Sequence, residues 1–93
     1  MNNAEAREVL ARELAGLRSQ SFADLKMLLG RPTTRDVRGA SGAHYQVELE
    51  AFWDSRPGGD LRVIGAVDDG GVRALLPLTD SFIIAPNGRL VGE

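Results

Sequence analysis

The sequence predicts an α+β fold, with an N-terminal two-helix hairpin packed on one face of a four- to five-stranded antiparallel meander sheet. Apolar residues recur at every third or fourth position as far as residue 30, a spacing that indicates helices. After Pro32 they recur at every second position, which indicates strands. The segments between the strands are too short for the crossover helices that parallel strands need, so we expect antiparallel pairing.

Two helices are predicted by apolar stripes and by capping residues. The first stripe comprises Ala6, Leu10, Leu14 and Leu17, and Asn2 or Asn3 is a suitable N-cap for that helix. The second helix is predicted to begin after Ser21, with a stripe that reaches Leu29, because Ser21 precedes an acid three residues later. Gly30 and Pro32 then end it. A short connection makes the two helices a hairpin.

Strands are expected at residues 33–38, 44–54, 61–67, 72–76 and 82–85. Residues 44–54 show the clearest alternation, and Asp68-Asp69-Gly70-Gly71 is typical of a hairpin turn. Residues 33–38 are polar, so we expect an edge strand there. All 93 residues are interpreted as a single α+β domain, 1–93, because the chain is too short for two.

The strand pattern also predicts a second, partly apolar sheet face. If Val47, Leu49 and Trp53 face the helices, the opposite face carries Phe52, Ile64 and Leu75. A solvated sheet face is normally polar. Two interpretations remain open: residues 82–84 fold over this patch, or Phe52, Ile64 and Leu75 form an interface with a second copy or another protein.

A second candidate site lies at one end of the sheet. Trp53, Asp54 and Asp60 flank a Pro-Gly-Gly loop, and an aromatic ring beside carboxylates is suited to a small ligand or to acid–base work. The simpler interpretation places Trp53 in the core and the acids in turns. Whether the acidic strand-end loops bind a cation is left open.

Composition excludes several functional classes. The chain has no cysteine and a single histidine, His44, so thiolate zinc sites are absent and nothing indicates a Ser-His-Asp triad. The net charge of −2 makes nucleic acid an unlikely partner, and Arg31, Arg35 and Arg38 are interpreted as a solvated edge. No signal peptide or membrane span is predicted. We expect a cytoplasmic protein without a cofactor.

The C-terminal half resembles a family of small uncharacterised bacterial proteins. The resemblance rests on residues 45–54 (YQVELEAFWD), 56–63 (RPGGDLRV), 68–71 (DDGG) and 77–86 (PLTDSFIIAP). It implies a stand-alone domain of unknown function, and it transfers no site residues.

From the partly apolar second face, the sequence predicts a small non-enzymatic binding or interaction module, as a homodimer or with another protein partner. The alternative is a ligand-binding protein or enzyme with its site near Trp53, Asp54 and Asp60.

Overall fold

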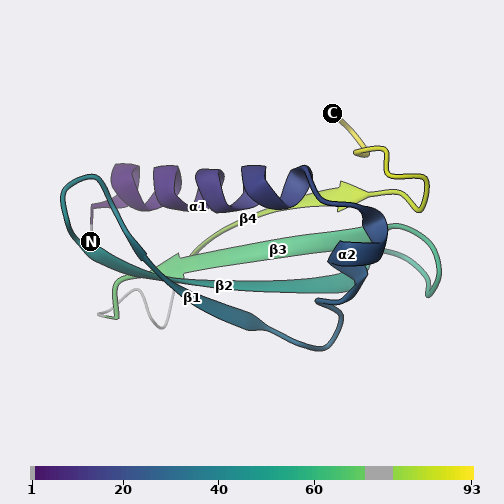
Figure 1. The fold of residues 1–93 in the computed structure, drawn as a ribbon, viewed down its shortest axis with the longest axis horizontal. Helices are drawn as coiled ribbons and strands as arrows, with labels where there is room; N and C mark the ends of the chain where they lie inside the picture. Colours follow the sequence, from purple (N-terminus) through teal and green to yellow (C-terminus); the bar gives the residue numbers. More distant parts are fainter. Residues whose placement is uncertain (1, 71–76) are drawn as a thin grey trace.

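The structure is a computed structural model that describes residues 2–70 and 77–93. Helix α1 spans Asn3–Arg18 and lies across one side of a sheet, and the short helix α2 spans Phe22–Lys26 near one end of that sheet (Figure 1). The predicted α+β fold, with N-terminal helices on an antiparallel meander, is confirmed.

Both helices begin at the capping residues that the sequence predicts. The Asn2 side chain accepts a hydrogen bond from the Glu5 N–H at 3.1 Å, and the Ser21 hydroxyl accepts one from the Asp24 N–H at 3.1 Å. Helix α2 is shorter than its apolar stripe suggests. It ends at Lys26, and the Leu28 carbonyl just beyond it accepts a hydrogen bond from the Ala51 N–H. In place of the expected last α-helical turn the chain makes i→i+3 turns, in which the Leu28 N–H donates to the Leu25 carbonyl and the Leu29 N–H to the Lys26 carbonyl.

The sheet has four strands in the order β1-β2-β3-β4, each antiparallel to the next. Their bounds are β1 Thr33–Arg38, β2 His44–Trp53, β3 Leu61–Asp68 and β4 Leu78–Ile84. Strand β4 begins earlier than the expected range 82–85, because Leu78 and the polar residues 79–81 also pair with β3. The strand expected at 72–76 lies outside the described residues.

The predicted assignment of side chains to the two faces is confirmed for β2 and β3. Leu49 pairs with Gly65 and Ala51 with Val63 on the helix-covered face, and the side chains of Leu49, Ala51 and Val63 are buried there. The core combines these strand residues with apolar residues of α1 and β4. Its buried members are Ala6, Val9, Leu10, Leu14, Leu25, Tyr45, Val47, Leu49, Ala51, Leu61, Val63, Val67, Phe82 and Ile84.

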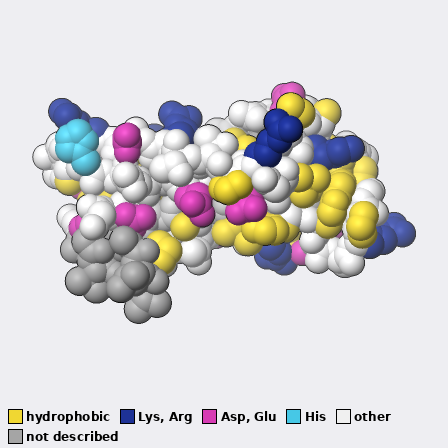
Figure 2. Space-filling view, turned by 90° about the horizontal axis from the view of Figure 1, so that it is seen from below, with side chains coloured by type: hydrophobic (Ala, Val, Ile, Leu, Met, Phe, Trp, Pro, Cys, Tyr) yellow, Lys and Arg dark blue, Asp and Glu magenta, His cyan; other side chains and the backbone are white. Residues whose placement is uncertain are grey.

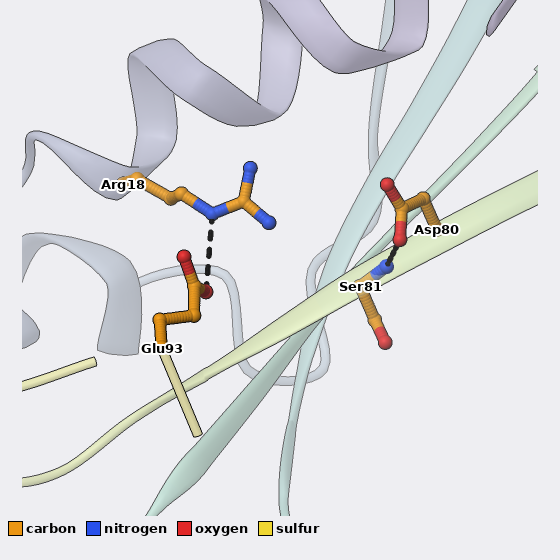
Figure 3. A network of polar contacts seen from close by, with 4 residues as sticks. All are labelled: Arg18, Asp80, Ser81 and Glu93. Atoms are coloured by element: carbon orange, nitrogen blue, oxygen red, sulfur yellow. Dashed lines mark hydrogen bonds and ion pairs between the residues drawn. The ribbon is translucent and has the colours of Figure 1, made fainter. Parts of the chain in front are cut away.

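The C-terminal segment does not fold over the second face of the sheet, so that interpretation is wrong. Residues 82–84 belong to β4, and Phe82 and Ile84 are buried on the helix side. Beyond the strand, the Val91 N–H donates a hydrogen bond to the Ile83 carbonyl. The chain then reaches the end of α1, where Arg18 pairs with Glu93 at 3.4 Å (Figure 3). Alternation within β4 holds Phe82 and Ile84 on the helix side, and Ile83 lies within the other face as part of the sheet instead of covering it.

Candidate functional site

The sheet face opposite the helices, here called the open face, is covered by no described segment. Phe52 on β2 is 43% exposed, and Ile64 and Ala66 on β3 and Ile83 on β4 are half-buried. Seen from this side, hydrophobic side chains gather between charged ones (Figure 2). The structure therefore brings the predicted interface residues Phe52 and Ile64 to one surface, whereas Leu75 lies outside the described residues.

Arg62 lies between apolar residues of the open face, with Phe52 on one side and Ile83 on the other. It pairs with Phe52 across the β2–β3 ladder, and its guanidinium binds Asp54 Oδ1 at 3.0 Å and donates to the Ser81 hydroxyl at 3.3 Å. These contacts join β2, β3 and β4 beside the apolar residues. A shallow hollow of about 320 Å³ next to them is lined by Arg62, Ile64, Thr79, Asp80 and Ser81.

The residues of the predicted ligand site point in different directions. The Trp53 ring packs on the helix side, 6.5 Å from the Phe22 ring and 6.0 Å from Lys26 Nζ. Asp54 instead reaches Arg62 on the open face. The Asp54 N–H donates to the Asp60 carbonyl at 2.9 Å, so these two acids close the base of the loop through their backbones. The ligand site stays a prediction that this arrangement does not favour.

A buried polar cluster lies where α1 meets the β1–β2 turn, and sequence reasoning missed it. Glu5 is 9% exposed. Its carboxylate accepts hydrogen bonds from the Tyr45 hydroxyl at 2.7 Å, the Ser41 hydroxyl at 2.8 Å and the Ser41 N–H at 2.8 Å. Gly39 lies against it, since a Cβ there would come within 2.6 Å of Glu5 Cδ. Ser41 and Tyr45 are far from Glu5 in the sequence. The only sequence signal for the cluster is the presence of Gly39 and Tyr45 near the β1–β2 turn.

The hydrogen bonds shift the pKa values of both titratable members. Donation from the Tyr45 hydroxyl, and then from Ser41, lowers the pKa of Glu5 below its ordinary value of 4.5. The bond to Glu5, with burial and the charges of Glu5 and Asp69, raises the pKa of Tyr45 to about 12. Near neutral pH the Glu5 carboxylate therefore stays charged and the Tyr45 hydroxyl stays protonated. Because neither group titrates there, we interpret the pair as a structural contact.

The arginines around β1 hold different contacts. Arg35 Nε lies 3.1 Å from Glu13 Oε1 of α1, in an ion pair without hydrogen-bond geometry. Arg38 Nη2 lies 3.1 Å from His44 Nε2. Both arginines are exposed, and Arg35 also reaches from the sheet to helix α1. This agrees with the expected solvated edge.

Another hollow of about 320 Å³ separates α1 from β4 and is lined by Arg7, Leu10, Ala11, Leu78, Thr79 and Asp80. The Asp80 carboxylate accepts the Ser81 N–H at 2.8 Å (Figure 3). Among residues 2–70 and 77–93, no group of three or more His, Cys, Asp or Glu side chains is arranged to hold a metal ion. In the same residues, no helix is long and apolar enough to cross a membrane.

Comparison with known proteins adds no family to this description. No protein-family model matches the chain, and neither a curated protein nor a solved structure matches it. The resemblance to a family of small uncharacterised bacterial proteins therefore remains a prediction, and the chain is characterised by its α+β meander fold alone.

Proposed function

We propose that this chain is a non-enzymatic interaction module that self-associates through its open face. The observation that carries the proposal is the apolar patch around Phe52 and Ile64, over which no described segment lies. An antiparallel sheet with one solvated face normally carries polar side chains there. Apolar clusters next to polar residues mark interaction surfaces. Here the polar neighbours are Glu50, which lies opposite Ile64, and Arg62, which lies between Phe52 and Ile83.

A second copy is the simplest partner for this patch, because the commonest assemblies of soluble proteins are two-fold symmetric dimers. In such a dimer the same patch meets itself, so Phe52 and Ile64 of each copy contribute to the contact. The apolar side chains lose solvent exposure. Arg62, which lies between Phe52 and Ile83, enters the contact with its charge paired to Asp54.

Sedimentation equilibrium of the wild type across a range of concentrations tests the proposal. The apparent mass should rise with concentration, and Ile64→Glu should lower the association constant, because a carboxylate would be buried in the contact. Gln46→Glu is the matched control, since Gln46 of β2 is exposed on the same face of the sheet but outside the patch. Far-ultraviolet circular dichroism confirms that both variants stay folded. A wild type that remains monomeric throughout, or equal association by both variants, rejects the proposal.

The alternative function, ligand binding near Trp53, is tested by the emission of this single tryptophan. A ligand seated between Trp53 and Asp54 would have to displace the Phe22 or Lys26 contact, and the emission would then change with saturation. We expect no saturable change across a panel of divalent metals and common metabolites. A saturating response that Asp54→Asn abolishes would favour the alternative.

A further inference from the structure

Strand β1 is a sheet edge whose backbone groups are directed outward. The Gly39 N–H donates to the Ala43 carbonyl at 2.8 Å, in line with the β1–β2 register. Hydrogen-bonded and non-hydrogen-bonded pairs alternate along an antiparallel ladder. The N–H and C=O groups of Thr34, Asp36 and Arg38 therefore point away from β2, and no described backbone group bonds them.

The other edge of the sheet is partly closed. The Val91 N–H donates to the Ile83 carbonyl of β4 at 2.8 Å, and Leu90 bridges Ile84. Among the described strands, β1 is thus the edge along which no further backbone segment pairs. An exposed row of donors and acceptors is a template for pairing with a further chain.

The order of charges on β1 selects one way of pairing with a copy of itself. A two-fold axis perpendicular to the sheet keeps the faces of both copies aligned, so each residue meets one from its own face. Centring the axis on Arg35, Asp36 or Arg38 would set that charge against itself. Centring it on Val37 sets Asp36 of each copy opposite Arg38 of the other.

We propose that two copies of this chain pair antiparallel along β1, with Val37 on the two-fold axis. The outward N–H and C=O groups of Asp36 and Arg38 then bond across the interface as hydrogen-bonded pairs. Their side chains form opposite-charge pairs on the open face, which stabilise a ladder. Val37, half-buried against the core, meets Val37 of the second copy on the helix side.

The contacts of the neighbouring residue Arg35 do not obstruct pairing in this register. Arg35 is occupied by Glu13 of α1 and would lie opposite Gly39, which has no side chain to obstruct it. Charges along an edge suppress indiscriminate pairing, and in this register alone they attract. The proposal concerns a surface other than the Phe52 and Ile64 patch, which edge pairing leaves exposed, so the two can succeed or fail separately.

Cysteine cross-linking tests the register directly, because the chain has no cysteine of its own. Val37 would be a non-hydrogen-bonded pair with Cα atoms about 4.5 Å apart, within the range that a disulfide spans. Val37→Cys should therefore form a disulfide-linked dimer under mild oxidation, seen on a non-reducing gel. Thr34→Cys is the control, because Thr34 is more exposed but lies away from the axis. Equal cross-linking of the two variants would overturn the proposed register.

Charge exchange tests the pairing without a covalent trap. Asp36→Arg and Arg38→Asp each set like charges opposite one another in both symmetric positions. Each should weaken edge association by about tenfold, measured by sedimentation equilibrium in the Ile64→Glu background at low salt. The double variant restores opposite charges and keeps the net charge of −2, so association should recover. Singles without effect, a double variant that does not recover, or a parent without any association would each refute the proposal.

Discussion

The Tyr45 hydroxyl donates a hydrogen bond of 2.7 Å to Glu5 Oε1, and this bond joins strand β2 to the first turn of α1. Tyr45 is only 2% exposed, and Ser41 donates to the same carboxylate from the β1–β2 turn. A buried carboxylate is tolerable when its oxygens are satisfied in this way. The contact therefore holds the helix end, the turn and the sheet together.

Removing the carboxylate should destabilise the fold. Glu5→Ala leaves the Tyr45 hydroxyl and the Ser41 N–H without their acceptor, and such orphaned donors are more costly than the loss of an exposed charge. We expect a clearly lower urea midpoint for Glu5→Ala than for Glu8→Ala, which removes an exposed glutamate of the same helix. Equal midpoints for the two variants would show that the cluster contributes little to stability.

The pKa shifts predict how stability depends on pH. The pKa of Glu5 is lower in the folded chain than its ordinary 4.5, so protons bind the unfolded chain more tightly. The contribution of Glu5 to stability is complete above pH 4.5, the ordinary pKa, and is lost as the pH falls through the lower pKa of the folded chain. The pKa of Tyr45 rises from 10.0 to about 12, so its contribution is present below pH 10 and is lost as the pH rises toward 12.

Denaturant unfolding at a series of pH values measures both effects. The stability difference between wild type and Glu5→Gln should shrink as the pH is lowered below 4.5, because the wild-type carboxyl then becomes neutral too. Tyr45→Phe should lose stability less steeply than wild type in the alkaline range. A wild-type advantage over Glu5→Gln that stays constant in acid would contradict the assignment.

Gly39 should be intolerant of a side chain. A Cβ would meet Glu5 Cδ at 2.6 Å and Tyr45 Cε2 at 2.9 Å, so the cluster must shift. We expect Gly39→Ala to lower the free energy of unfolding by about 1–3 kcal/mol, as overpacking does. The penalty should shrink in the Glu5→Ala background, because the obstructing carboxylate is gone. Chemical denaturation of the four proteins in this cycle measures the coupling, and strict additivity would argue against the close approach.

Gly65 sets the distance between α1 and the sheet. A Cβ there would lie 2.7 Å from Leu10 Cδ1 and 3.2 Å from Leu14 Cδ2, so Gly65→Ala should destabilise by about 1–3 kcal/mol. Gly16→Ala is the contrasting control, since it has nothing within 4 Å. Within helix α1 it should stabilise by about 0.5–1 kcal/mol. Thermal unfolding distinguishes the two, and a neutral Gly65→Ala would mean that α1 can move outward at little cost.

The layers of the sheet could be predicted because alternation along β2 and β3 is strict. Val47, Leu49 and Val63 are buried where the pattern places them, and the burial of one face fixes the register. The start of β4 could not be found in this way, because Thr79, Asp80 and Ser81 are polar and resemble a loop. Their strand conformation comes from pairing with β3, a tertiary effect that local composition does not carry.

The candidate sites were predicted less completely. Phe52 and Ile64 share the open face as expected, since period-two alternation determines which side chains share a surface. The prediction grouped Trp53 with Asp54, although adjacent residues of a strand point to opposite faces. Nothing in the sequence around Glu5 predicts that this residue is buried. Its burial depends on Ser41 and Tyr45, which approach it only when the turn is folded against the helix.

The placement of α1 also constrains the order in which the molecule can fold. Each strand pairs with the next one in sequence, so the sheet can grow by local steps with short loops. Helix α1 packs against β3 and β4, the elements furthest from it along the chain. During synthesis the apolar stripe of α1 thus lacks its complete native surface until both β3 and β4 have emerged, and docking of α1 is the long-range event that completes the core.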